Sequence, residues 1–147
     1  MGDKIIVQNK KARFNYELLD FFEAGIVLMG CEIKSIRLHD VSLDGTFILI
    51  RNHQVILKNM NIKKYEFSNQ QTIESDRDRI LLLSKKEIKK IENRIQLEKV
   101  VVIPTKLYLK NNYAKLEIAI GLGKKLYDKR ETIKQRDISK KLNKFKG

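Results

Sequence analysis

The sequence predicts a mainly β protein built as a small antiparallel barrel. Two stretches, "TFILIRNHQVILK" and "TKLYLKNNYAKLEIAI", carry apolar runs on either side of a turn, and the second alternates apolar and polar residues. Such alternation places one face of a strand inward and the other in solvent. The most strongly helical pattern, "SKKEIKKIENRIQLEK", lies between strand groups and follows no β-α-β rhythm. Hairpins with one intervening helix favour a barrel over a parallel sheet.

The first strong element is a long strand over residues 16–29, "YELLDFFEAGIVLM", which is rich in aromatic and branched residues. Gly25 lies inside it, and an interior strand glycine usually marks a bend or a bulge, so we expect one there. The next stretch, "GCEIKSIRL", carries Ile33 and Ile36 among charged residues. This spacing predicts a short helix from Cys31 to about Leu38.

The middle of the chain predicts a hairpin, a loop, a short strand and a helix. The hairpin turns at "RNHQ", the polar residues 58–79 form a long loop that ends in "ESDRDR", and "ILLL" follows as a short buried strand. Ser84 and Glu87 then match the S-x-x-E pattern of a capping box. Apolar residues recur behind this box at helical spacing, which predicts a helix.

The last elements are the strand "VVVIP" and a hairpin about the turn Asn111-Asn112. The whole pattern gives about six strands and two helices, joined as antiparallel hairpins. We therefore expect residues 1–123 to form an OB-like closed antiparallel β-barrel with short peripheral helices. Barrels of this kind often bind nucleic acid.

The charge of the chain points to a polyanionic partner. The net charge is +13, from 31 basic and 18 acidic side chains. Residues 121–147 carry ten basic and three acidic side chains, a net charge of +7, which leaves +6 for the first 120 residues. Cations that neutralise phosphates release condensed counterions, so a domain this basic is typical of nucleic-acid binders.

Residues 124–147 are expected to be a basic, flexible tail. Their apolar stripe, Ile138, Leu142 and Phe145, is narrow and too short to hold a helix in free water. Thr132 and Gln135 nevertheless match a capping box. We therefore expect the tail to be disordered alone and helical on its partner.

The motif "GLGKK" does not match an enzyme's phosphate loop. A P-loop needs Ser or Thr after the lysine, and a dinucleotide loop needs a third glycine. Gly121 and Gly123 are instead expected to let the chain turn out of its last strand. With the single Cys31, neither an intrachain disulfide nor a Cys-based zinc site is possible. His39 and His53 fall on predicted turns, away from that cysteine.

No acid–base pair, metal cluster or cofactor motif stands out, so we expect a protein that is not an enzyme and has no cofactor. A small nuclease that uses Asp40, Asp44 or the acids of "ESDRDR" remains a weaker alternative. The chain has no signal-peptide core and no stretch approaching ~20 apolar residues. We therefore expect a reduced, cytoplasmic protein with no membrane partner.

Near the N-terminus, "NKKARFNY" interleaves Lys10, Lys11 and Arg13 with Phe14 and Tyr16. Cations that contact phosphates beside rings that stack on bases are typical of RNA-binding segments. A solvated charge run next to core aromatics explains the same eight residues equally well.

Several motifs together resemble a known family. They are "NKKAR", "FEAGIVLMGCEIKSIR", an arginine-containing loop before "LLL", and "KLYLKNNYAKLEIAIGLGKKLYDKRETIKQRD". In this order, from about Asn9 to Asp137, they resemble the SsrA-binding protein family, or small protein B. The resemblance implies an OB-like barrel that binds RNA and has no catalytic activity.

The same resemblance implies a role in trans-translation. Members of the family bind the tRNA-like domain of transfer-messenger RNA (tmRNA, or SsrA RNA) and deliver it to stalled ribosomes. There the tail occupies the decoding centre of the small subunit, among ribosomal RNA, and the empty message channel.

The resemblance and the basic segments together indicate the functional residues. Those expected to bind RNA are Asn9, Lys10, Lys11, Arg13, Glu23 and Leu82. Those expected to act in the tail on the ribosome are Lys124, Lys125, Tyr127, Asp128, Lys129, Arg130, Lys134 and Arg136. The carboxylate at Glu23 suits base or 2′-hydroxyl donors rather than phosphate.

Three features of the sequence depart from the family pattern. Phe14 stands where histidine is usual, Ser75 and Asp76 lack the proline common in their loop, and Ile80 replaces a frequent lysine. The alternative is a ribosomal or initiation-factor-type OB protein that binds ribosomal RNA. Such a protein would bind ribosomal components but no tRNA-like RNA.

Overall fold

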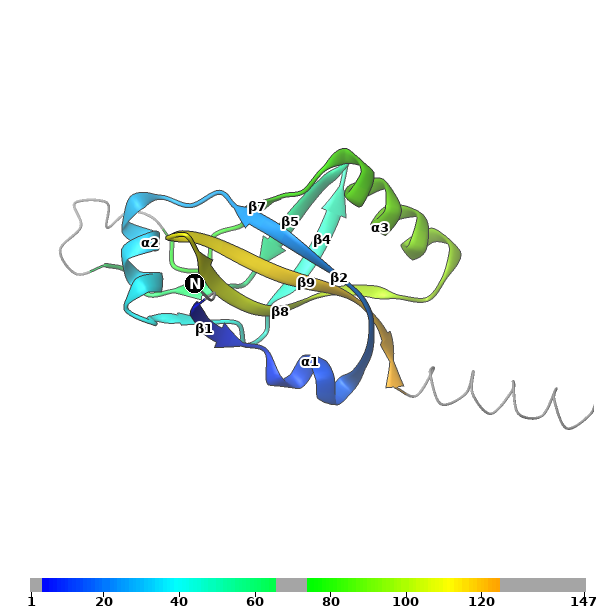
Figure 1. Ribbon diagram of the computed structural model, residues 1–147, viewed down its shortest axis with the longest axis horizontal. Coiled ribbons are helices and arrows are strands. Elements are labelled where there is room, and N and C mark those ends of the chain that lie inside the picture. The colour runs from blue at the N-terminus through cyan, green and yellow to red at the C-terminus, as the bar shows by residue number, and fades with distance from the viewer. Residues whose placement is uncertain (1–3, 66–73, 125–147) are drawn as a thin grey trace, which may run out of the picture.

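The computed structural model describes residues 4–65 and 74–124, and its core is a seven-stranded antiparallel sheet in the order β1-β8-β9-β2-β7-β5-β4 (Figure 1). The elements are β1 Lys4–Gln8, α1 Lys10–Asn15, β2 Tyr16–Ile26, α2 Gly30–Arg37, β3 Val41–Ser42, β4 Phe47–Arg51, β5 Gln54–Lys58, β6 Asn61–Ile62, β7 Arg79–Leu82, α3 Lys85–Leu97, β8 Val101–Lys110 and β9 Tyr113–Gly123. Strands β3 and β6 form a separate two-stranded sheet. The prediction of a mainly β, antiparallel fold is confirmed.

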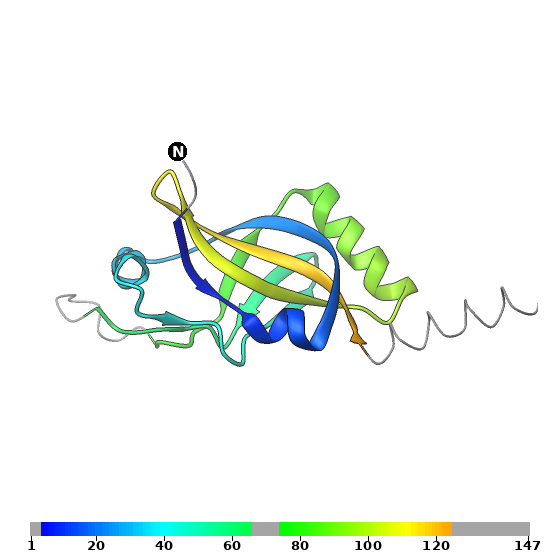
Figure 2. The same ribbon diagram turned by 60° about the horizontal axis from the view of Figure 1, so that its bottom comes forward.

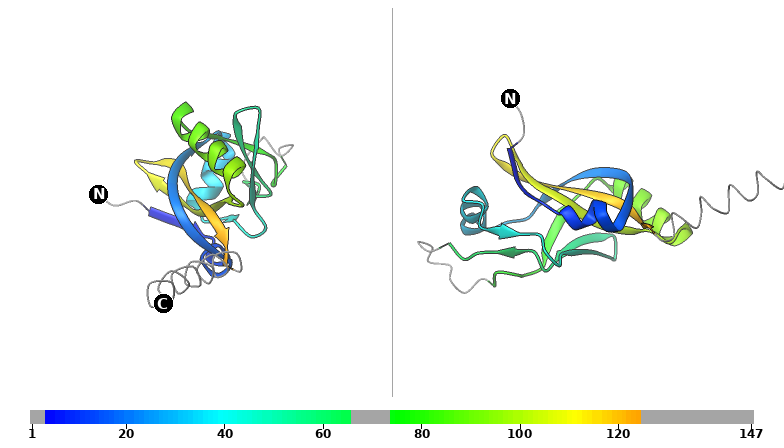
Figure 3. Two further views of the ribbon diagram at one scale, coloured as in Figure 1. Left: turned by 90° about the vertical axis from the view of Figure 1, so that its right-hand side faces the viewer. Right: turned by 90° about the horizontal axis from the view of Figure 1, so that it is seen from below.

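The sheet curls strongly, but its ends do not pair, so the expected closed barrel is not seen. Viewed end-on, the β4–β5 hairpin lies across from the β8–β9 hairpin (Figure 3, left). Strand β1 pairs with β8 only over residues 106–109. The edge of β8 over Val101–Thr105 therefore has no strand partner within the described residues, and it faces β4 across an open seam.

The three longest strands, β2, β9 and β8, lie next to one another in the sheet. The β2–β9 ladder and the β8–β9 ladder each contain a bulge. In β2 the register shifts between Leu18 and Asp20, so the bulge expected as one possibility at Gly25 lies elsewhere in the strand. A Cβ built at Gly25 would lie 3.4 Å from the Cβ of Leu82 on β7, which is an ordinary van der Waals contact.

Both predicted hairpins are confirmed, and so is the chemistry of their turns. The β4–β5 hairpin turns at Asn52 and His53, and the β8–β9 hairpin turns at Asn111 and Asn112. All four residues have positive φ, between 50° and 68°. Asparagine tolerates this left-handed backbone better than most residues, which is why it is common in two-residue hairpin turns.

The predicted helices are confirmed as α2 and α3. The Ser84 side chain accepts a hydrogen bond from the Glu87 N–H at 3.2 Å, and the Glu87 side chain accepts one from the Ser84 N–H. Helix α3 then buries Ile91 against the core at one end of the sheet (Figure 1). In α2, the Glu32 side chain accepts from the Met29 N–H at 2.9 Å and closes the first turn.

Strand β1 and helix α1 were not predicted. The segment "KIIVQ" pairs with β8, about a hundred positions away in sequence, so no local pattern signals it. Helix α1 spans only six residues and has no side-chain cap. It lies under the sheet and joins β1 to the start of β2 (Figure 2). Ala12 is its buried residue.

The prediction for the two glycines near the end of β9 is wrong for Gly121. It remains in the strand, opposite Val101 and Leu18, and Gly45 is the one glycine with positive φ in the described part of the chain. A Cβ at Gly121 would lie 2.6 Å from the Cδ1 atom of Ile103. Glycine is needed there for close packing rather than for a turn.

The loop before β7 turns its arginines inward. Arg79 is fully buried and donates to Glu32 Oε2 at 2.6 and 2.8 Å, and Arg77 donates to Glu32 Oε1 at 2.5 Å. Arg79 also donates to the Ser75 carbonyl oxygen at 2.9 Å. The arginines of "ESDRDR" therefore form internal ion pairs, and their acid partner lies on α2. None of the helices in the described residues is long and apolar enough to cross a membrane.

Candidate nucleic-acid interface

The candidate interface is the surface of β2, β9 and β8 that points away from the core, called here the outer face. Cross-strand pairing fixes its members. Glu23 lies opposite Glu117, which lies opposite Lys106, and Lys115 lies between Gly25 and Tyr108. The alternate residues Ala24, Leu116 and Leu107 are buried in the core. Period-two alternation thus gathers charged and aromatic side chains on one side of the sheet.

Glu23 lies at the centre of the outer face and is held by neighbours from β8. The Tyr108 hydroxyl donates a hydrogen bond to the carboxylate, and Lys110 Nζ lies 3.6 Å from it. The Tyr108 hydrogen bond lowers the pKa of Glu23, with further contributions from Lys110 and Lys115. The carboxylate is therefore ionised, oriented and exposed near neutral pH.

Leu82, which the resemblance also indicated, lies opposite Gly25, two residues along β2 from Glu23. Leu82 is 57% exposed on β7, beside Gly25 of β2. The Cβ position of Gly25 lies 3.4 Å from Leu82 and 3.8 Å from Lys115 Nζ. A carboxylate, an apolar side chain and an ammonium group thus share one small area of surface.

Helix α1 adds Lys10 and Arg13 to one end of the outer face. Together with Phe21 of β2 and Lys106 of β8, they line a hollow of about 420 Å³. The Arg13 guanidinium lies 6.0 Å from the centre of the Phe21 ring, which is 45% exposed. Cations beside an exposed ring are the combination that binds a phosphate and stacks on a base.

Asn9 and Lys11 behave differently from Lys10 and Arg13. The Asn9 side chain donates a hydrogen bond to the Pro104 carbonyl oxygen at 2.9 Å. The Asn9 backbone N–H donates to the Thr105 carbonyl oxygen at 2.7 Å. Asn9 therefore ties the start of α1 to β8. Lys11 lies on the other side of α1, at the seam between β4 and β8.

A second carboxylate is fixed beside the first. The Thr105 hydroxyl donates to Glu117 Oε2 at 2.5 Å and also lies 3.1 Å from the Glu117 carbonyl oxygen. Thr105 is the extra residue of the bulge in β8. The outer face thus presents two oriented acceptors, Glu23 and Glu117, among five cations. These cations are Lys10, Arg13, Lys106, Lys110 and Lys115.

The sequence analysis missed several members of the outer face, among them Lys106, Tyr108, Lys110, Lys115 and Glu117. The alternation in "TKLYLK" and "YAKLE" carries the signal that would have found them. Since Leu107, Leu109 and Leu116 point one way, the residues between them must point the other way.

Departures from the family pattern have structural counterparts. Phe14 is 77% exposed, so it does not pack in the core. Ile80 is 41% exposed on β7, and the carbonyl oxygen of Ser75 accepts hydrogen bonds from Arg79 and from the Ile62 N–H. The backbone of the loop that carries Ser75 is thus bound internally.

The residues considered for a nuclease do not assemble. No group of three or more His, Cys, Asp or Glu that could hold a metal ion occurs within residues 4–65 and 74–124. His53 contacts Glu92 of α3 at 2.9 Å, and His39 lies 3.3 Å from the carbonyl oxygen of Ile6. The backbone carbonyl of Asp40 accepts from the Lys63 N–H, and the Asp44 N–H donates to Ser42.

Of the residues expected to act in the tail, the structure describes Lys124, which is exposed directly after β9. The others lie outside the described residues: Lys125, Tyr127, Asp128, Lys129, Arg130, Lys134 and Arg136.

Comparison with known proteins identifies the family of this chain. The family described as "SmpB protein" matches residues 6–146. The SsrA-binding protein of Mycoplasma mycoides is 56% identical over 142 residues, 96% of each chain, and that of Mesoplasma florum is 56% identical over 148 residues, 99% of each chain. A solved structure described as "tmRNA-SmpB: a journey to the center of the bacterial ribosome" superimposes with a TM-score of 0.66 at 32% identity, covering 80% of this chain and 82% of that one. The chain therefore belongs to the SmpB protein family.

Proposed function

We propose that this protein binds the tRNA-like domain of tmRNA and delivers it to stalled ribosomes in trans-translation. The observation that carries the proposal is the outer face, where five cations surround two oriented carboxylates in a chain of the SmpB family. The protein acts by binding, in the cytoplasm, without a catalytic step or a cofactor.

The two kinds of charge on the outer face have separate roles in this proposal. Lys10, Arg13 and Lys106 neutralise phosphates, which supplies affinity that falls with salt. Glu23 repels phosphate and accepts hydrogen bonds from base N–H groups or 2′-hydroxyls, which unpaired RNA nucleotides expose. Leu82 covers apolar edges of the same nucleotides.

The domain organisation is part of the proposal. Residues 1–123 form an OB-like RNA-binding barrel in which β4 faces β8 across the open seam. Residues 124–147 form a basic tail that is disordered alone and becomes helical in the decoding centre and the empty message channel. In the tail, Tyr127 stacks on a ribosomal base while Lys129 and Arg130 bind phosphates.

The test of RNA binding is a salt titration with the tRNA-like domain of tmRNA, with ordinary tRNA and a stem-loop of equal charge as competitors. The proposal expects binding that survives both competitors at physiological salt. If all three RNAs bind equally, the protein recognises only charge, and the alternative that it binds ribosomal RNA is favoured.

The test of the tail is truncation after Gly123, matched with the substitutions Lys129→Ala and Arg130→Ala in the full chain. Affinity for the tRNA-like domain should change little, while peptide tagging on stalled ribosomes should be lost. A tail truncation that abolishes RNA binding as thoroughly as Glu23→Ala with Lys10→Ala would contradict the separation of roles.

A further inference from the structure

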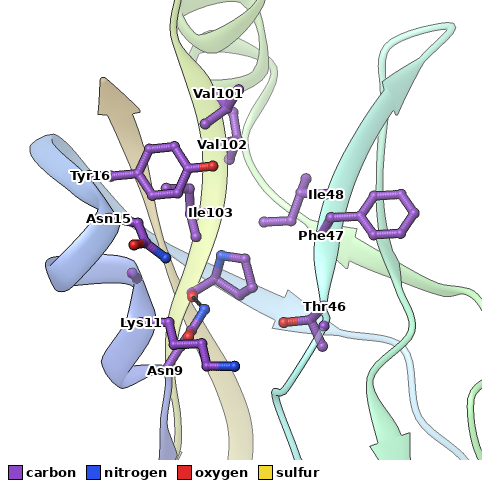
Figure 4. Close-up of a pocket in the computed structure, with 13 residues that line it drawn as sticks. Asn9, Lys11, Asn15, Tyr16, Thr46, Phe47, Ile48, Val101, Val102 and Ile103 are labelled. Atoms are coloured by element: carbon purple, nitrogen blue, oxygen red, sulfur yellow. Dashed lines mark hydrogen bonds between the residues drawn. The ribbon is translucent and has the colours of Figure 1, made fainter. Parts of the chain in front are cut away.

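The seam between β4 and β8 contains a cleft of about 400 Å³ on the opposite side of α1 from the hollow that Lys10 and Arg13 line (Figure 4). Its apolar wall consists of Ile48 from β4 with Val102 and Ile103 from β8. In Figure 4 the Ile48 side chain points across the seam toward β8. A concave, mostly apolar site of a few hundred Å³ is typical of a small-ligand site.

Three polar side chains meet at the rim of this cleft: Lys11 and Asn15 from α1, and Tyr16 at the start of β2. In Figure 4 the Lys11 ammonium and the Tyr16 hydroxyl both point toward the space between the strands. No hydrogen bond or ion pair joins these polar groups to another residue of the described chain. They are therefore available to a ligand.

The cleft is held in shape by contacts outside it. The Asn9 side chain fixes α1 to the Pro104 carbonyl oxygen, and Thr46 fixes the β4 side by donating to the Leu43 carbonyl oxygen at 2.6 Å. Gly121 behind the cleft leaves room for Ile103 and Tyr16, because a Cβ there would lie 2.6 Å and 3.3 Å from their nearest atoms.

From this arrangement we infer that the seam cleft binds one unpaired RNA nucleotide, with its base between Ile48 and the β8 wall and its phosphate on Lys11. The Tyr16 ring offers a surface for the base, and the Asn15 amide offers both a donor and an acceptor to its edge. The cation at the rim and the net charge of +13 favour an anionic ligand. The inference rests on the proposed function, since it takes RNA as the ligand.

This second site would make α1 a divider between two contacts with the RNA. Adjacent lysines of one helix turn point about 100° apart, so Lys10 and Lys11 can serve different sites. Lys10 lies with Arg13 at the outer face, and Lys11 lies at the seam. An RNA that follows the outer face past α1 would reach the cleft with its next unpaired nucleotide.

The experiment uses full-length protein with ¹³C-labelled methyl groups and four single-stranded ribonucleotide tetramers, one of each base. We expect the methyl signals of Ile48, Val102 and Ile103 to shift on addition of at least one tetramer. Lys11→Ala should weaken this binding about tenfold, as expected for the loss of a charge-assisted contact. Lys89→Ala, at an exposed lysine of α3 away from both RNA surfaces, is the matched control, and it should leave the same signals and affinity unchanged.

A cleft-filling variant, Ile48→Trp, should abolish the tetramer shifts while an unchanged amide spectrum elsewhere confirms folding. If the wild-type cleft signals do not move with any tetramer, or if Lys89→Ala and Lys11→Ala weaken binding equally, the inference is wrong. It is also wrong if truncation after Lys124 shifts these methyl signals without RNA, because the tail then occupies the cleft. A salt titration with the tRNA-like domain separates this failure from failure of the proposed function, since specific binding there can persist with an empty cleft.

Discussion

Two carboxylates of this chain, Glu32 and Glu23, both bind cations, but in opposite surroundings. Glu32 is 4% exposed and is bound by Arg77, by Arg79 and by the Met29 N–H. Glu23 is exposed, and it is bound by one hydroxyl and one lysine at 3.6 Å. The first group has every hydrogen-bonding position filled from within the protein. The second retains unfilled lone pairs beside cations that outnumber the acids.

The comparison shows how to separate structural charges from binding charges in a chain this basic. A buried pair must be complete in itself, because an unpaired buried charge is costly. Among the described residues, no buried side-chain nitrogen or oxygen lacks a hydrogen-bond partner. A binding surface is incomplete by nature, because the partner supplies the missing charges. Arginines near "ESDRDR" and lysines of the outer face look alike in sequence, yet they fall into opposite classes.

The largest effect is expected from removing one side of the buried pair. Arg79→Ala leaves the Glu32 carboxylate buried without its main partner, which should lower the free energy of unfolding by about 3–5 kcal/mol. Urea denaturation measures it. The matched change at the exposed pair, Lys110→Ala, should cost less than about 1 kcal/mol. Equal destabilisation of the two variants would show that burial does not distinguish the two carboxylates.

Lowering the pH should reduce the stability that Glu32 contributes more than the stability that Glu23 contributes. Burial opposes ionisation of Glu32, but hydrogen bonds from Arg77, Met29 and Arg79 outweigh it and lower its pKa. The unfolded chain, with a glutamate pKa of about 4.3, therefore takes up the proton first as the pH falls. This stabilisation is complete above that value and is lost as the pH falls through the lowered pKa. Unfolding free energies between pH 6 and pH 3 should fall more steeply in the wild type than in Glu32→Gln. Glu23→Gln should reduce this slope less, because the lowered pKa of Glu23 belongs to an exposed carboxylate that solvent screens.

The excess of cations on the outer face should appear as salt dependence. Lys106→Ala with Lys115→Ala should weaken binding to the tRNA-like domain at every salt concentration. It should also reduce the slope of log affinity against log salt by about 0.7–0.9 for each phosphate that is no longer neutralised. Lys89→Ala with Lys90→Ala on α3 is the matched pair away from this face. If the α3 pair changes the slope as much, the RNA does not lie on the outer face.

The smallest effect is expected at the hydroxyl that orients Glu23. Tyr108→Phe removes that donor, so the pKa of Glu23 should rise toward its ordinary value, as a ¹³C titration of its carboxyl signal would measure. RNA affinity should fall about fivefold, as expected when one hydrogen bond of about 1 kcal/mol is removed. Tyr113→Phe, at a ring that is 70% exposed on the hairpin, is the control. An unchanged Glu23 titration would show that Tyr108 does not orient it.

Local signals in the sequence predicted the hairpins and helices well. Asparagine turns, the capping box at Ser84 and apolar periodicity all act within a few residues of the structure that they form. Non-local features were missed, because β1 pairs with a strand about a hundred residues away and the β4–β8 seam depends on where β1 stops. The bulge of β2 lies between Leu18 and Asp20 rather than at Gly25. The prediction for Gly121 was wrong for the same reason, since the Ile103 and Tyr16 side chains that crowd this position come from other strands.

The candidate site was predicted in part. Glu23 and Leu82, indicated by resemblance, lie on the neighbouring strands β2 and β7, and Lys10 and Arg13 lie at the same face. Physical pattern alone could not separate Lys10 from Lys11, because a six-residue helix without a cap gives no sign of its rotation. The missed lysines lie in β8 and β9. The alternation of these strands was recognised in the sequence, but their outward-pointing residues were not considered as a binding surface.

The bulge at Thr105 has a consequence for how this chain tolerates changes in length. Before it, the even-numbered residues Val102 and Pro104 point inward; after it, the odd-numbered Leu107 does. The one extra residue therefore changes which positions of β8, even-numbered or odd-numbered, point into the core. Deleting a single residue from either half would exchange interior and exterior for all positions on one side of the cut. Viable length variants of the β8–β9 hairpin should accordingly change by two residues at a time, one from each strand at its tip.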